Sequence, residues 1–186
     1  MYKIKDITKN EINQCSRLHR QELPEDLFAL LGEKFLGRYY ESLLKDSSLK
    51  FCLFIEKNKV KGACFFVKRF RVFPFLAQNF LIFNVSSIKL LCFRPKKIFS
   101  MIDIALLLLS FPKRLPDYEL AYIYVSDDAK GKGIGQQLIS HIDLQEESWV
   151  KTLETTPRNI EFYKRNRYFI VDKKRGRVFL KRNKDG

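Results

Sequence analysis

The sequence lacks the features of a secreted or membrane-spanning protein. Its four cysteines, at positions 15, 52, 64 and 92, lie in apolar surroundings and form no Cys-x-x-Cys pair, which argues against a zinc site or a disulfide framework. No apolar run reaches the roughly 18 residues needed to span a bilayer, and residues 1–6 lack the apolar segment of a secretory signal. We therefore expect a cytoplasmic protein with reduced, buried thiols.

Acidic residues are scarce as well. The 21 aspartates and glutamates are outnumbered by 35 lysines and arginines, so the formal net charge is +14. Such a charge attracts nucleic acid, an acidic membrane surface or a phosphorylated small molecule, and does not choose among them. The two histidines, His19 and His141, have no partners at metal-ligand spacing, so no metal site is predicted.

What the chain does have is enough apolar material for one core. Phenylalanine occurs 17 times and hydrophobic residues make up 46%, which excludes a disordered protein. Residues 1–186 are long enough for a single domain and do not require two. Apolar periodicity and turn residues predict strands at 2–7, 49–55, 60–70, 118–125, 149–154, 168–172 and 177–181, and helices at 8–21, 27–44, 133–147 and 157–167.

An unusual segment, at about 71–116, separates two of these strands. It alternates apolar stretches with basic clusters and is interrupted by prolines, and we expect helices at 86–93 and 97–109. Basic residues beside apolar ones suit an acidic membrane surface or a phosphate-bearing acceptor. The plain alternative is that the segment packs its apolar side on the sheet and leaves its lysines in water.

A glycine-rich loop between a predicted strand and helix is the strongest chemical signal. Its glycines let backbone N–H groups turn toward one point, and a following helix adds the positive end of its dipole. The spacing matches neither the nucleotide-triphosphatase loop nor the dinucleotide fingerprint. The loop predicts a phosphate site formed by Lys130, Gly131, Lys132, Gly133, Ile134, Gly135 and Gln136; the alternative is a flexible strand-to-helix loop whose lysines are solvated.

The order of elements in the C-terminal half resembles the GNAT superfamily of acyl-CoA-dependent N-acetyltransferases. The strand 119–125 with the loop 130–135 is similar to the acetyl-CoA motif [Gln/Arg]-x-x-Gly-x-[Gly/Ala], and 159–168 is similar to the next motif, in which Asn is followed by Tyr four residues on. Two residues depart from the pattern. Lys130 replaces Gln or Arg, and Arg167 replaces Gly, so we expect the turn after the last helix to be built differently.

The resemblance implies an α/β (α+β) GNAT fold. Its mixed, twisted central sheet of six to seven strands would carry helices on both faces and a helical insertion between the third and fourth strands. Acetyl-CoA, the acyl-donor cosubstrate, would enter a V-shaped opening between the fourth and fifth strands, without a metal. The backbone of Ile123, Tyr124 and Val125 would pair with the pantetheine arm, the loop amides would hold the pyrophosphate, and Asn159 would reach the pantetheine.

Two side chains are candidates for proton transfer. An alkylamine has a pKa of about 10.4 and must lose a proton to attack; the resemblance offers Glu119 as the base, and the alternative is a structural ion pair with a lysine. The departing thiolate needs a proton, which the resemblance assigns to Tyr163. The alternative is that Tyr163 only packs the last helix on the sheet.

The expected function is transfer of an acetyl group from acetyl-CoA to a primary amine of a small, anionic acceptor. Residues 23–40 loosely resemble bacterial GNAT proteins linked to cell-surface polysaccharide synthesis, which suggests an amino sugar derivative. The alternatives are acetylation of a protein or peptide, and a non-catalytic CoA-, membrane- or nucleic-acid-binding module. No recognition-helix motif predicts a specific nucleic acid. Peripheral membrane association and the oligomeric state, a dimer among the options, stay open.

Overall fold

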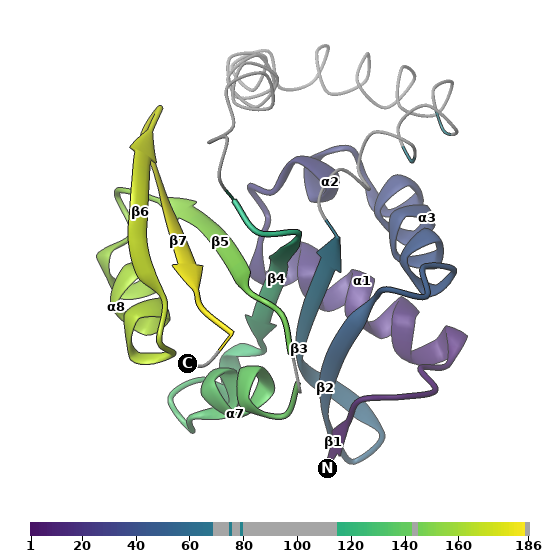
Figure 1. Ribbon diagram of the computed structural model, residues 1–186. Coiled ribbons are helices and arrows are strands. Elements are labelled where there is room, and N and C mark those ends of the chain that lie inside the picture. Colours follow the sequence, from purple (N-terminus) through teal and green to yellow (C-terminus); the bar gives the residue numbers. More distant parts are fainter. Residues whose placement is uncertain (69–74, 76–78, 80–114, 143–144, 185–186) are drawn as a thin grey trace.

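A computed structural model describes residues 1–68, 75, 79, 115–142 and 145–184, except for the side chain of residue 27 (Figure 1). The predicted insertion helices at 86–93 and 97–109 lie outside these residues. Within the described part of the chain, no helix is long and apolar enough to cross a membrane.

The centre of the molecule is a mixed seven-stranded sheet in the order β1-β2-β3-β4-β5-β7-β6. All neighbours are antiparallel except β4 and β5, which are parallel. Its strands are β1 (Tyr2–Lys3), β2 (Lys50–Glu56), β3 (Lys59–Lys68), β4 (Tyr118–Val125), β5 (Ser148–Leu153), β6 (Phe169–Lys174) and β7 (Arg177–Arg182). This sheet confirms the predicted fold class.

Helices cover both faces of the sheet, as predicted. Successive side chains of a strand point to opposite faces; accordingly Phe65 of β3 belongs to the core cluster under the N-terminal helices, and its neighbour Phe66 to the cluster under the C-terminal helices. The N-terminal helices are α1 (Lys9–Glu22), α2 (Leu27–Leu30) and α3 (Glu33–Leu44), and the C-terminal helices are α7 (Ile134–Ser140) and α8 (Pro157–Arg165) (Figure 1).

Three predicted elements differ in length. The single helix expected at 27–44 is broken at Gly32, whose φ of +102° cannot continue a helix. The first strand stops at Lys3 instead of residue 7, because Asp6 has φ +55° and Thr8 already caps α1, with Glu11 completing the capping box. The helix expected at 133–147 ends at Ser140.

A buried polar network joins α1, α3 and β4. His19 is fully buried; its Nδ1 lies 3.0 Å from the Tyr40 hydroxyl, whereas its Nε2 stands 3.2 Å from Asp26 Oδ1 without forming a hydrogen bond. The Tyr40 hydroxyl in turn lies 2.7 Å from that of Tyr124. Because buried polar groups are costly when unpaired, these contacts fix α1 and α3 against the strand that borders the site.

Candidate active site

The parallel strands β4 and β5 diverge almost as soon as they meet. Only Tyr118 with Ser148 and Glu119 with Trp149 are paired between them, whereas the other edge of β4 stays paired with β3 as far as Val125. The far half of β4 therefore presents an edge that has no partner on β5. This is the V-shaped opening expected from the resemblance.

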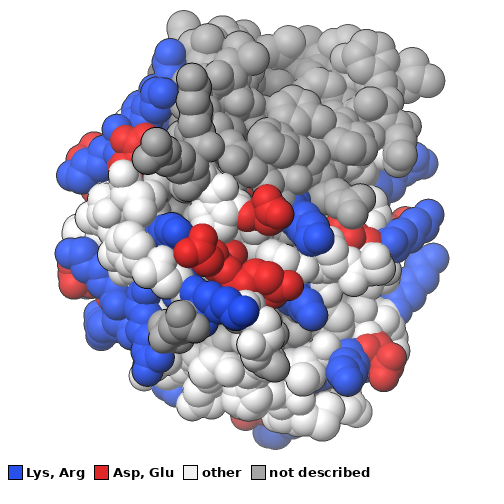
Figure 2. All heavy atoms as spheres, viewed as in Figure 1, with Lys and Arg blue, Asp and Glu red and all other residues white. Residues whose placement is uncertain are grey.

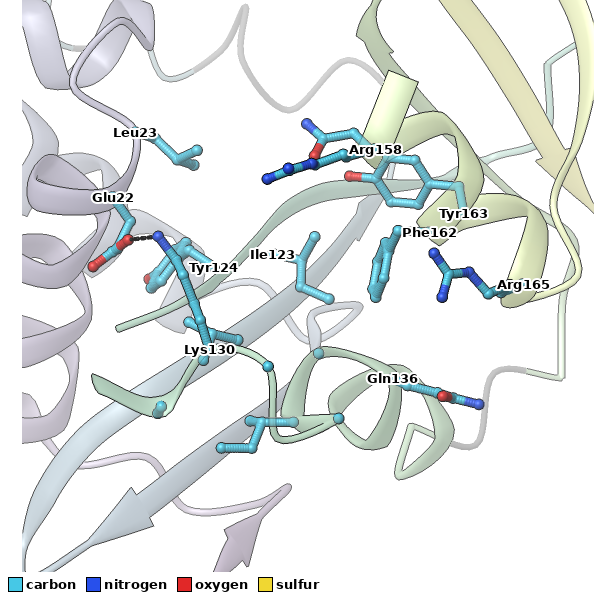
Figure 3. A pocket seen from close by; sticks show the side chains of 17 residues that line it. Glu22, Leu23, Ile123, Tyr124, Lys130, Gln136, Arg158, Phe162, Tyr163 and Arg165 are labelled. Carbon is cyan, nitrogen blue, oxygen red and sulfur yellow. Dashed lines mark hydrogen bonds and ion pairs between the residues drawn. The ribbon is translucent and has the colours of Figure 1, made fainter. Parts of the chain in front are cut away.

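A cavity of about 690 Å³, which we call the donor cavity, occupies this opening (Figure 3). The end of α1, the far half of β4, the glycine loop and α8 line it. It brings together most of the predicted site: Ile123, Tyr124, Val125, Lys130, Gly131, Gly133, Ile134, Gly135, Gln136, Asn159 and Tyr163. Lys132 and Glu119 are not among its lining residues.

The glycine loop bends sharply between β4 and α7. After the short 3-10 turn η2 (Asp127–Ala129), Gly131 has φ +77°, and Gly133, the N-cap of α7, has φ +73°. Glycine adopts such left-handed angles without steric cost, which is what lets consecutive amides face one ligand. Because α7 has only seven residues, we assign the capacity to bind an anion chiefly to the loop amides.

The two lysines of the loop are already engaged within the protein. Lys130 Nζ lies 2.6 Å from Asp127 Oδ1 and 2.6 Å from Glu22 Oε2, and these carboxylates, Asp127 first, raise the pKa of Lys130. Lys132 Nζ donates to the backbone oxygen of Asp128 at 2.9 Å. Their contact with a pyrophosphate stays a prediction, and for Lys130 it requires exchange of a carboxylate partner.

Two arginines of α8 that sequence reasoning missed line the donor cavity. Arg158 and Arg165 flank Phe162 on its wall, and Figure 3 shows Arg165 between Phe162 and Gln136. No described carboxylate lies within the 4.0 Å ion-pair distance of either guanidinium. Positions 158, 162 and 165 follow the i, i+4, i+7 spacing of one helix face, so this face could have been predicted once Asn159 was placed near the cofactor.

Tyr163, the predicted proton donor, borders the donor cavity. It is 8% exposed, and Figure 3 shows its hydroxyl directed into the donor cavity. No described residue is hydrogen-bonded to that hydroxyl. Burial, and then the neighbouring Tyr168 and Cys64, raise the pKa of Tyr163 above its ordinary value. The phenol therefore keeps its proton at neutral pH and has no competing acceptor among the described side chains.

Glu119 lies at the closed end of the opening, where β4 and β5 are paired. Its carboxylate is bound to the ammonium of Lys151, which also stands 5.4 Å from the centre of the Trp149 ring. The ion pair that was the structural alternative is therefore present. The role of general base stays a prediction, and because Glu119 does not line the donor cavity it would act there through water.

The described residues contain no group of three or more His, Cys, Asp or Glu side chains that could hold a metal ion.

Comparison with known proteins agrees with this geometry. A family profile described as "Acetyltransferase (GNAT) domain" matches residues 104–168, which include β4, the glycine loop and α8. Solved structures share the fold over nearly the whole of both chains: PH1933 from Pyrococcus horikoshii (13% identity, 98% of each chain, TM-score 0.60) and an acetyltransferase from Thermus thermophilus (12%, 98% and 97%, 0.59).

A third similar structure is the Campylobacter jejuni N-acetyltransferase PseH in complex with acetyl coenzyme A (12% identity, 98% of this chain and 99% of that chain, TM-score 0.51). The curated proteins contain no match. The family profile covers the cofactor motif itself, and the fold, the opening between β4 and β5 and the glycine loop agree with it. Residues 104–168 thus match a GNAT acetyltransferase domain, and the chain as a whole shares its fold with solved acetyltransferases.

Proposed function

We propose that this protein transfers the acetyl group of acetyl-CoA to the primary amine of a small, anionic acceptor such as an amino sugar derivative. The observation that supports it most is the donor cavity, in which an unpaired strand edge, a glycine loop and a buried tyrosine border one space. A strand edge suits the amides of a pantetheine arm, and loop amides suit a pyrophosphate. The similar PseH structure contains acetyl coenzyme A.

The reaction needs a base and an acid, and we assign these roles to Glu119 and Tyr163. The acceptor amine loses a proton, by way of water to Glu119, and attacks the thioester carbonyl to form the C–N bond. As the C–S bond breaks, Tyr163 donates its proton to the departing sulfur. Burial raises the pKa of Tyr163, so the phenol is protonated at neutral pH and has a proton to give in this step.

An anionic acceptor agrees with the charge of the chain. The net charge of +14 attracts anions over a distance, and Arg158 on the cavity wall has no described carboxylate partner. An amino sugar joined to a phosphate-bearing carrier would combine the required amine with a negative charge. The PseH neighbour is named as an N-acetyltransferase, which agrees with an amine acceptor in general.

Two measurements test the proposal. Calorimetry should show binding of acetyl-CoA; no binding at millimolar concentration would contradict an acetyl-CoA-dependent activity. A thiol-release screen of amino sugars, polyamines and peptides should then find turnover with amino sugars that carry phosphate. Turnover with peptides alone would replace the small acceptor by a protein.

A further inference from the structure

A second cavity, of about 560 Å³, adjoins the donor cavity and shares Gln136 and Arg165 with it. The end of α7, the turn after α8 and the end of β7 enclose this cavity. We call it the basic pocket, because Arg165, Arg167, Arg182 and Lys184 line it, whereas its described lining residues include no aspartate or glutamate.

The cations of the basic pocket are not neutralised by the described part of the protein. No described carboxylate lies within 4.0 Å of any of the four. Arg182 is held by aromatic rings instead, with its guanidinium carbon 5.9 Å from the centre of Phe66 and 5.5 Å from that of Tyr168. Like charges gathered in one cavity repel each other, so an anion bound among them would be stabilised.

Arg167 occupies a backbone position that disfavours it. Its φ is +66°. The N–H of Arg167 bonds to the oxygen of Lys164 at 3.0 Å, and the N–H of Tyr168 to the oxygen of Tyr163 at 3.1 Å, which together form a Schellman cap. Glycine is usual at this position because a β-carbon is strained there. The expectation that replacing glycine by Arg167 changes the turn is therefore wrong: the turn is kept and the arginine adopts it.

From this backbone position the side chain of Arg167 lines the basic pocket. Figure 2 shows Lys and Arg gathered at the lower left of the molecule, where α7, α8 and the C-terminal end of the chain meet in Figure 1. The gathered cations without described carboxylate partners point to an anionic ligand.

We propose that the basic pocket binds a phosphate monoester. Such a group carries nearly two negative charges at neutral pH, and the planar guanidinium of arginine matches its oxygens in pairs. The phosphate has two sources. It belongs either to CoA, which carries a 3′-phosphate and would reach the pocket across the shared wall, or to a separate phosphorylated molecule. Only the first source rests on the proposed function.

The test compares Arg167→Gly with Arg175→Gly. Arg175, with φ +50°, is also strained, but it lies in the turn between β6 and β7 and lines neither cavity. Each substitution removes one positive charge and one strained β-carbon. Both variants should therefore melt at the wild-type temperature or up to about 3 °C above it, so loss of folding does not confuse the result.

Calorimetric titrations of the three proteins use CoA, dephospho-CoA, which lacks only the 3′-phosphate, and inorganic phosphate added to protein saturated with CoA, whose 3′-phosphate would already fill the pocket if it belongs there. Arg167→Gly should weaken binding of one phosphate probe about tenfold, and Arg175→Gly should not. If CoA is weakened and dephospho-CoA is not, the phosphate is that of CoA. If inorganic phosphate is weakened, the ligand is a separate molecule.

The proposal is overturned if Arg167→Gly changes none of the three affinities, or if both variants lose affinity equally, since the latter would reflect net charge alone. If the wild type binds neither CoA nor dephospho-CoA, the proposed function fails instead. Titration of the free protein with inorganic phosphate, wild type against Arg167→Gly, then decides on the basic pocket by itself.

Discussion

The donor cavity and the basic pocket share a wall but present positive charge in different ways. In the donor cavity Lys130 of the glycine loop is paired with Glu22 and Asp127, and beside it stand Arg158 and Arg165, which have no described carboxylate partner. In the basic pocket the charge sits on side chains without described carboxylate partners. The comparison teaches that nearby basic residues are not equivalent: where partners already hold a cation, its removal should matter little.

The largest effect should come from the loop backbone. Gly133→Val places a branched side chain at φ +73°. It should displace the loop and break two or more of the hydrogen bonds that its backbone amides would donate to the pyrophosphate. The affinity for acetyl-CoA should then fall on the order of 1,000-fold in calorimetry. Gly176→Val is the control, because Gly176 has φ +67° but lies in the turn between β6 and β7. Equal loss in both variants would refute the placement of the pyrophosphate.

The second largest effect should come from removing the proposed proton donor. Tyr163→Phe should lower kcat on the order of 100-fold and leave the KM for acetyl-CoA nearly unchanged, because only the phenolic proton is lost. Tyr168→Phe, which removes a buried hydroxyl that lies 3.0 Å from that of Ser148 and does not line the donor cavity, should keep kcat within about twofold of the wild type. A wild-type kcat in Tyr163→Phe would leave packing as the role of Tyr163.

The donor cavity contains both a cation paired with carboxylates, Lys130, and one without a described carboxylate partner, Arg158, so the two can be compared directly. Arg158→Ala should raise the Kd for acetyl-CoA about tenfold, because its guanidinium is available to a phosphate. Lys130→Ala should raise it less than about threefold, because Lys130 already binds Asp127 and Glu22. Calorimetry on both variants measures the difference, and the reverse order would contradict the distinction between paired and unpaired cations.

The smallest effect concerns the turn before the glycine loop. Hydrogen bonds from Lys61 and Ser126 hold the pKa of Asp128 at about 2, below its ordinary value. Because the folded-state pKa lies below the unfolded one, the stabilisation is complete above about pH 4 and is lost as the pH falls through about 2. Asp128→Asn should therefore lower the urea midpoint slightly at pH 7 and leave it unchanged near pH 2.

The Asp128→Asn variant also separates an effect on folding from an effect on acetyl-CoA binding. Asp128 is exposed, so its contribution to stability is small, and its replacement should not change the Kd for acetyl-CoA. A clear loss of affinity in Asp128→Asn at pH 7 would show that the charges around the loop act on the ligand as well.

Local pattern and turn chemistry predicted most of the fold. The capping box at Thr8 marked the start of α1, and the strand 118–125 was placed with both ends correct. The break at Gly32 was missed because the apolar spacing continues across it, and periodicity does not report a single backbone angle. The end of α7 was misplaced for a similar reason, since no proline or glycine follows Ser140 to mark it.

The sequence predicted the parts of the candidate site whose backbone is fixed by a motif. It did not predict which side chains form ion pairs there. Glycine spacing located the loop, but nothing in the sequence shows that Lys130 would bind Glu22, which lies 108 residues earlier in the chain. Likewise the left-handed angle of Arg167 depends on the cap that closes α8. Long-range pairing and tertiary constraint override local preference at such positions.

The short pairing of β4 with β5 has a mechanical consequence. Only two residue pairs join the four strands β1 to β4 to the three strands β5 to β7, so few backbone hydrogen bonds connect these two halves of the sheet. An acyl donor lying along the edge of β4 would fill the opening between β4 and β5 and contact both halves of the sheet. A bound donor would then raise the force needed to separate the two halves of the sheet.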